Sequence, residues 1–241
     1  MTDRPAAPAD ARILLGVAAT LALVAGYVDA ICFDGVFDVF PANQSGNAVL
    51  LGISIGKGRG GDSWRPAVAI VGFALGVGLA IVLGSRIPHR HRPELLLALE
   101  VVMLAPLVVV LLDADHPTAT LTGAGAGLLL LLTTAAMGIQ TEVIRRVAGV
   151  AVATTYQSGA IVRMSELAVR RLVPGAPDDG TLPGVAVLAA VLAAYVAGAA
   201  FGAALDGGRG ALLVPVAVLV LLGASAPRWR LRLEQPPAGT Q

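Results

Sequence analysis

The organisation of this chain is decided by the stretch Val39-Phe40-Pro41-Ala42-Asn43-Gln44-Ser45-Gly46-Asn47-Ala48-Val49-Leu50-Leu51-Gly52. It places four hydrogen-bonding side chains inside an otherwise apolar run: Asn43, Gln44, Ser45 and Asn47. Beside lipid such groups need protein or water around them, because unsatisfied polar groups there are costly. Pro41 interrupts what precedes, and Asn43 or Ser45 can cap a helix that follows. The stretch predicts a broken or re-entrant element whose helix N-terminus lies at membrane depth.

The composition is that of a polytopic membrane protein. Of the 241 residues, 56% are hydrophobic and only 14% are charged, with a mean hydropathy of +0.79, whereas about a quarter of a soluble domain is charged. Six windows read as transmembrane helices: 13–33, 66–85, 95–112, 119–139, 184–205 and 211–226. We therefore expect an all-α, polytopic transmembrane helix bundle with six spans plus two broken or re-entrant polar segments.

The domain organisation follows from these windows. Residues 13–226 form a single transmembrane domain, residues 1–12 a disordered cytoplasmic tail, and residues 227–241 a second cytoplasmic tail. A signal peptide is the other interpretation of residues 13–33. The apolar run is longer than a typical signal sequence and lacks a clean small-x-small cleavage site, so a retained helix is preferred.

The distribution of Lys and Arg predicts the orientation. With six spans, 13 basic residues lie on the side of both termini and 4 on the other side. If both polar segments crossed completely, giving eight spans, the count would be 11 against 6. The six-span topology is favoured, and we expect a multi-pass protein of the cell (inner) membrane with both termini cytoplasmic.

Several classes of function are disfavoured. A net charge of +1 argues against a nucleic-acid surface, and Cys32, the one cysteine, leaves no internal disulfide or cysteine-based metal site. His89 and His91 lie in a basic loop without a carboxylate at ligand spacing. We expect no bound metal and no cofactor. We also expect no enzymatic activity, since Ser45 and Ser158 lack a nucleophile elbow and a histidine base.

Two carboxylates fall inside predicted spans. Asp29 lies about one turn inside the end of the first span, and Glu100 lies some six residues into the third. An ionisable residue at such a depth is a functional candidate and needs a partner or a water path. For Asp29, a carboxylate that reaches the interface is an equally good interpretation.

A second segment further along the chain has a sequence similar to that of the polar stretch. Gln44-Ser45-Gly46 and Gln157-Ser158-Gly159 are 113 residues apart, and Gly26 and Gly138, near the ends of two spans, are 112 apart. The order of the G-x-x-x-G spans also matches. The pattern predicts an internal repeat with halves of about 13–112 and 119–226. With three spans per half, the halves would be inverted, an arrangement found in transporters.

Two G-x-x-x-G motifs, Gly72/Gly76 and Gly198/Gly202, allow close helix packing within the chain or between subunits, so a homo-oligomer through these faces is a candidate. Beyond the second polar segment, residues 160–172 predict an amphipathic helix at the cytoplasmic surface, with Arg163 and Glu166 paired.

The motifs Gly26-Tyr27-Val28-Asp29-Ala30, Asn43-Gln44-Ser45-Gly46-Asn47, Met137-Gly138-Ile139-Gln140 and Thr154-Thr155-Tyr156-Gln157-Ser158-Gly159 resemble those of the YoaK-like family of bacterial multi-pass membrane proteins. The resemblance covers nearly the whole chain except its tails. In that family the hydroxyl-Gly-Asn core more often starts with Thr, where this chain has Ser45. The resemblance implies an integral membrane protein and carries no biochemical activity over.

Two functions remain open. The first is a small-solute transporter or channel in which polar side chains contact a small polar solute or ion. The candidate binding residues are Asp29, Asn43, Gln44, Ser45, Asn47, Glu100, Gln140, Glu142, Tyr156, Gln157 and Ser158. The second is a non-transporting sensor, scaffold or assembly partner. In both, the lipid bilayer is the surrounding partner.

Overall fold

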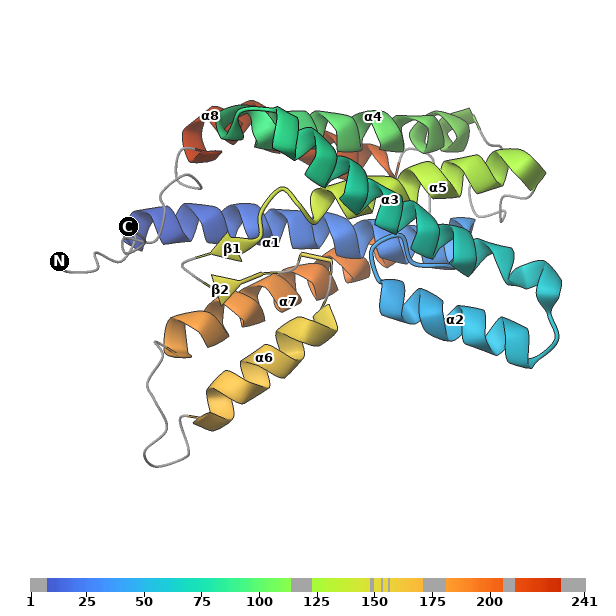
Figure 1. The fold of residues 1–241 in the computed structure, drawn as a ribbon, viewed down its shortest axis with the longest axis horizontal. Coiled ribbons are helices and arrows are strands. Elements are labelled where there is room, and N and C mark those ends of the chain that lie inside the picture. Colours follow the sequence, from blue (N-terminus) through green and yellow to red (C-terminus); the bar gives the residue numbers. More distant parts are fainter. Residues whose placement is uncertain are drawn as a thin grey trace.

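The computed structural model describes residues 8–113, 123–147, 150–152, 154–155, 157–170, 181–205 and 211–230. These residues form an all-α bundle (Figure 1). Five helices are long and apolar enough to cross a membrane. They are α1 (Pro8–Ile31, extended by a π-helical turn, Cys32–Val36), α3 (Trp64–Arg86), α4 (Arg92–Asp113), α5 (Gly123–Gln140) and α7 (Thr181–Ala204). The predicted sixth span, α8 (Leu213–Trp229), is a shorter apolar helix.

Two short helices begin inside the bundle. They are α2 (Gln44–Gly56) and α6 (Gln157–Arg170), with 13 and 14 residues. At about 1.5 Å per residue each is about 20 Å long, less than the roughly 30 Å of a bilayer core. In Figure 1 both begin near the middle of the molecule and run outward in different directions.

The connections contain little regular structure. Between α5 and α6 the chain forms a small antiparallel pair, β1 (Arg146–Val147) and β2 (Val150–Ala151), which the sequence interpretation did not anticipate. Single 3₁₀ turns, Gly60–Asp62 and His89–His91, precede α3 and α4.

Two helix boundaries differ from expectation. Residues 8–12, expected in a disordered tail, are helical because α1 begins at Pro8. At the other end, α8 continues to Trp229, past the predicted end at residue 226. The remainder of both predicted tails lies outside the described residues.

The helices pack in pairs. The most extensive contacts join α1 to α7 and α3 to α5, while α2 lies on α3 and α6 lies on α7. Helix α4 packs on α5, α8 packs on α1, and α4 and α8 contact each other. If α1, α2, α3 and α4 are exchanged in order with α5, α6, α7 and α8, the same set of contacting pairs results.

Glycines allow the two tightest pairs to form. A Cβ on Gly72 or Gly76 would overlap α5, and a Cβ on Gly198 or Gly202 would meet the backbone of α1. Both G-x-x-x-G faces are therefore occupied within the chain, the first of the two alternatives that the motifs left open.

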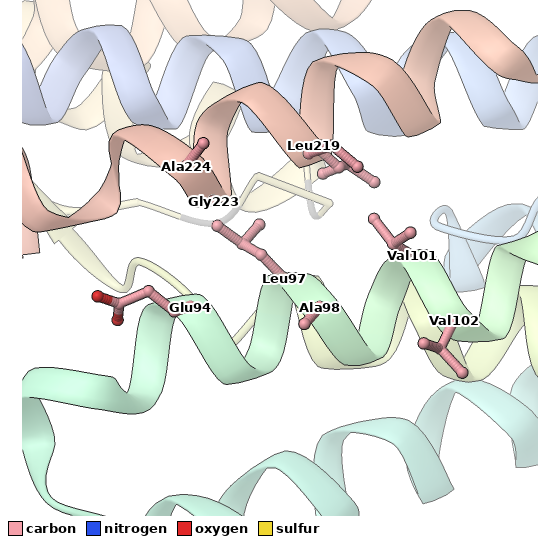
Figure 2. Close-up of a pocket in the computed structure, with 9 residues that line it drawn as sticks. Glu94, Leu97, Ala98, Val101, Val102, Leu219, Gly223 and Ala224 are labelled. Carbon is pink, nitrogen blue, oxygen red and sulfur yellow. The ribbon is translucent and has the colours of Figure 1, made fainter.

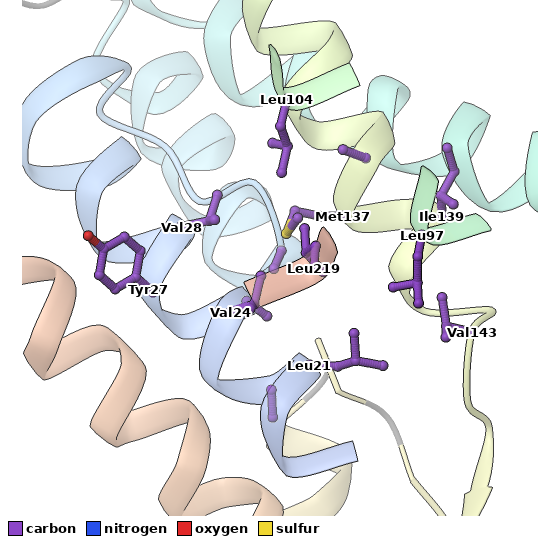
Figure 3. Close-up of a cluster of buried hydrophobic side chains, with 14 of the residues drawn as sticks. Leu21, Val24, Tyr27, Val28, Leu97, Leu104, Met137, Ile139, Val143 and Leu219 are labelled. Atoms are coloured by element: carbon purple, nitrogen blue, oxygen red, sulfur yellow. The ribbon is translucent and has the colours of Figure 1, made fainter. Parts of the chain in front are cut away.

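The interior is largely apolar, and large apolar side chains also cover the outside. Figure 3 shows a central cluster to which α1, α4, α5 and α8 contribute, with Val24, Leu104, Met137 and Leu219 among its members. Apolar residues such as Val102, at 65% exposure, face outward. This distribution suits a bundle surrounded by lipid rather than water.

Candidate functional site

The chain turns sharply between the end of α1 and the start of α2. Asp38 has a φ of +59°, in the left-handed region that a non-glycine residue rarely adopts. Asn43 is the N-cap of α2, and its Oδ1 accepts hydrogen bonds from the Gly46 amide at 3.2 Å and from the Ser45 hydroxyl at 2.8 Å. The predicted helix start is confirmed, and its cap satisfies a backbone N–H that would otherwise be unpaired.

The buried side chain of Asn47 stabilises the turn through hydrogen bonds. Its side chain is fully buried; Oδ1 accepts from the Phe40 amide at 2.9 Å, and Nδ2 donates to the Phe40 carbonyl at 2.6 Å and to Gln44 Oε1 at 2.9 Å. Gln44 Nε2 in turn donates to the Pro41 carbonyl at 2.8 Å. The four predicted polar residues of this segment thus lie together and bond largely to one another and to the local backbone.

Asp29 joins three parts of the bundle. Its carboxylate is 2% exposed, with Oδ1 accepting from the Ala42 amide at 2.6 Å and Oδ2 accepting from the Tyr195 hydroxyl at 2.5 Å. The side chain therefore holds α1, the irregular turn and α7 together instead of reaching the interface. Tyr195 was not among the predicted residues. Its signal was available, since a tyrosine in an apolar span needs a partner for its hydroxyl.

The second polar segment repeats one feature of the first. Gln157 Nε2 donates to the Thr154 carbonyl at 3.1 Å, as Gln44 does to the carbonyl three residues before it. Gln157 Oε1 is buried and has no partner among the described residues, because Ala160 stands where the first segment has Asn47. Ser158 is exposed, and the predicted Tyr156 lies outside the described residues.

In the predicted repeat, Thr141 corresponds to Asp29. The two are 112 residues apart, and the Thr141 hydroxyl lies 3.2 Å from the Thr155 hydroxyl, which belongs to the residue 113 positions after Ala42. One half thus has a carboxylate at this junction and the other half a neutral hydroxyl pair.

Gln140 and Glu142 have different surroundings. Gln140 is fully buried, and its Nε2 donates to the Leu21 carbonyl of α1 at 3.0 Å while its Oε1 has no partner among the described residues. Glu142 forms an ion pair with the exposed Arg145 at 3.4 Å. Of these two predicted residues, Gln140 belongs to the buried polar interior and Glu142 to the edge of the bundle.

Glu100 is the least satisfied polar group in this interior. Its side chain is fully buried on the same face of α4 as Leu97 and Leu104, which point into the central cluster (Figure 3). Neither carboxylate oxygen has a hydrogen-bond partner in the described part of the chain. An unpaired ionised carboxylate is strongly disfavoured inside a membrane bundle, so a proton, a cation or water must accompany it.

Comparison with known proteins places the chain in a family. Residues 17–225 match the family described as "Protein of unknown function (DUF1275)". The chain belongs to this family. The UPF0700 transmembrane protein YoaK of Bacillus subtilis (strain 168) is 30% identical over 149 residues. That match spans 61% of this chain and 63% of the relative, so it covers less than two thirds of the relative's length. No solved structure matches.

The predicted resemblance to the YoaK-like family is thereby confirmed. Together with the five long apolar helices, the DUF1275 match identifies a multi-pass integral membrane protein. Within the described residues of this DUF1275 member, His, Cys, Asp and Glu side chains do not gather in groups of three that could hold a metal ion.

A second feature lies away from the polar residues. Helices α4 and α8 border a groove of about 350 Å³, shown in Figure 2. Its walls are apolar, with Leu97 and Val101 on α4 facing Leu219 and Gly223 on α8. Among the described residues that line it, Glu94 is the one that is charged.

Proposed function

We propose that this protein moves a small polar solute or ion across the membrane through the interior between its two halves. The observation that carries the proposal is the set of buried oxygen atoms without partners among the described residues. In the bundle interior they are both carboxylate oxygens of Glu100, Oε1 of Gln140, Oε1 of Gln157 and the hydroxyl of Thr154; Glu94 Oε2, beside Arg230, is a further one. Hydrocarbon cannot satisfy such groups, whereas water, a solute or an ion can.

The recurrence of contacts between the halves supports an inverted repeat. A Cβ at Gly26 would overlap the backbone carbonyl of Tyr195, and a Cβ at Gly138 would overlap that of Phe73. The glycines are 112 residues apart and their partners 122 apart, so the same crossing of two helices occurs twice. In transporters built from such repeats, solute sites lie where the repeats meet.

The starts of α2 and α6 support the same location. Each short helix begins after irregular backbone in the interior, and irregular backbone is tolerated at membrane depth where it is enclosed by protein or lines a cavity. A helix N-terminus directs unpaired N–H groups and a partial positive charge toward a polar ligand. Asp29 and Asn47 hold the first of these starts in place.

Flux through purified protein tests the proposal. Proteoliposomes are exposed to inward gradients of water, glycerol, urea, potassium chloride and ammonium chloride, and swelling is followed by light scattering. We expect at least one probe to enter faster than into empty liposomes, and Asp29→Asn to reduce that rate about tenfold or more. Asp34→Asn, an exposed carboxylate five residues further on, is the matched control and keeps the rate. Equal flux in Asp29→Asn and wild type would remove Asp29 from the mechanism.

A non-transporting role as a sensor, scaffold or assembly partner is the second candidate. It is favoured by the first polar segment, where Asn43, Gln44 and Asn47 use their side chains to fold the turn. This candidate predicts no flux of any probe and a stable complex with another protein when the chain is isolated from native membranes. Both candidates are non-enzymatic.

A further inference from the structure

Glu100 is fully buried and lies far from both ends of α4. Arg92 is eight residues before it and Asp113 thirteen residues after it, which at roughly 1.5 Å per residue is about 12 and 20 Å along the helix axis. The residues that share its face of α4 are leucines, each at most 3% exposed: Leu96, Leu97, Leu104 and Leu107. Figure 3 shows two of them, Leu97 and Leu104, in the central cluster. The carboxyl group therefore lies among hydrocarbon side chains and cannot reach the charged ends of its helix.

The described elements that pack on α4 place no opposite charge beside Glu100. Helix α5 contains no ionisable residue, and the one in α8 is Arg228, in the last turn. The other charged and titratable groups around α4 lie at its ends: His89, Arg90, His91, Arg92, Glu94, Arg230 and Asp113. On α1, Asp29 already accepts two hydrogen bonds. An ionised Glu100 would thus have neither a donor nor a counter-ion among the described residues.

The described interior has acceptors to spare. Its side-chain atoms without a partner are all oxygens, since the amide nitrogens of Gln140 and Gln157 already donate. The buried nitrogens without a partner belong to Arg92 and Arg230, at one end of the α4–α8 pair. A proton on Glu100 turns one acceptor oxygen into a donor and removes a buried charge. Donor and acceptor balance and electrostatics therefore favour the same form of the side chain.

We propose that Glu100 is a proton-binding site, neutral in the closed bundle and ionised when the interior admits water, so that a proton is the ion that accompanies transport. This inference rests on the proposed function. In the opening step the carboxyl O–H bond breaks, its electron pair stays on the carboxylate, and the proton passes to water to form hydronium. Closure reverses the step.

A metal cation is the competing occupant. Ca²⁺ and Mg²⁺ require six or more oxygen ligands, supplied by protein, water or substrate. The described residues do not gather His, Cys, Asp and Glu side chains in groups of three, and the leucines around Glu100 cannot act as ligands. A proton needs no ligand beyond the carboxylate itself, which is why the proton is favoured.

Infrared spectroscopy of the purified full chain at neutral pH tests the site without any transport measurement. Glu100→Gln should remove the carbonyl band of a protonated carboxylic acid, because the side chain is neutral in the wild type. Glu166→Gln, an exposed and ion-paired carboxylate of α6, is the matched control and should remove carboxylate bands instead. Glu100→Leu, which extends the leucine face, serves the same comparison if Glu100→Gln fails to fold. Loss of carboxylate bands in the Glu100 variant, or carboxylate bands that shift when sodium chloride is added, would overturn the proposal.

Coupling is tested in proteoliposomes with the probe that enters in the flux measurement. Without a membrane potential, a proton gradient of about one pH unit should change the steady-state distribution of that probe by up to about tenfold in wild type, because one coupled proton then supplies about 1.4 kcal/mol. The gradient should have no effect in Glu100→Gln. An equal response in both proteins overturns the coupling. Failure of every probe to enter overturns the proposed function, whereas the infrared band still decides whether Glu100 holds a proton.

Discussion

The starts of α2 and α6 share one hydrogen bond and differ in how the other side-chain oxygens are paired. In both, a glutamine at the first helical position donates to the carbonyl three residues earlier. In the first half Asn47 accepts and donates further bonds, so Gln44 Oε1 is paired. In the second half Ala160 has no such side chain, and Gln157 Oε1 has no partner among the residues that the structure describes. The first segment satisfies its polar side chains with its own hydrogen bonds, whereas the second keeps an acceptor without a donor in the described part of the chain.

The junctions beside these segments differ in the same way. Asp29 accepts from Ala42 and from Tyr195, whereas Thr141 pairs with Thr155 through neutral hydroxyls. Phe73, the counterpart of Tyr195, has no hydroxyl to offer Thr141. Asp29 makes the first junction ionisable, whereas Thr141 and Thr155 leave the second junction neutral. The two halves therefore have different capacities for chemistry.

The largest expected effect tests whether the halves share their packing. Gly26→Val and Gly138→Val each place side-chain atoms on a backbone carbonyl of the partner helix, and each should destabilise the folded state by about 3 kcal/mol or more. Thermal unfolding of the purified protein in detergent measures this. Gly16→Val in α1 and Gly125→Val in α5 are matched controls with open space. A large loss at only one of the two glycines would break the proposed equivalence.

The next effect tests how the junctions differ. Asp29→Ala leaves the buried Ala42 N–H and the Tyr195 hydroxyl without an acceptor, so we expect a loss of about 2–3 kcal/mol. Thr141→Val removes two neutral hydrogen bonds, to the Met137 carbonyl and to the Thr155 hydroxyl, and should cost about 1 kcal/mol. The same unfolding measurement compares them. Equal losses would mean that the carboxylate contributes no more than a hydroxyl.

The smallest effect concerns the two glutamines. Gln44→Leu breaks two hydrogen bonds and removes one of the two acceptors of Asn47 Nδ2. We expect it to lower the free energy of unfolding by about 1–2 kcal/mol. Gln157→Leu breaks one bond but also removes a buried oxygen that has no partner among the described residues, so stability should change by about 0.5 kcal/mol or less. A larger loss for Gln157→Leu would indicate that its Oε1 is bonded to water or to a bound molecule.

Part of the candidate site could be predicted from the sequence. The N-cap at Asn43, the start of α2, and the amphipathic α6 with its Arg163–Glu166 ion pair were predicted from local patterns and are confirmed. Local chemistry decides these features, since a cap or an i,i+3 pair involves residues within one turn. The β1–β2 pair escaped notice because two-residue strands carry too short a pattern.

The sequence by itself determined the class of protein, the long apolar helices and the two polar helix starts, because hydropathy and capping act over short stretches of chain. Only the tertiary structure decided which buried polar groups are paired. Asp29 accepts a hydrogen bond from Tyr195, which lies 166 residues further along the chain, whereas Glu100 has no partner among the described residues. Such pairings depend on which helices lie side by side, and that is decided by packing over the whole bundle.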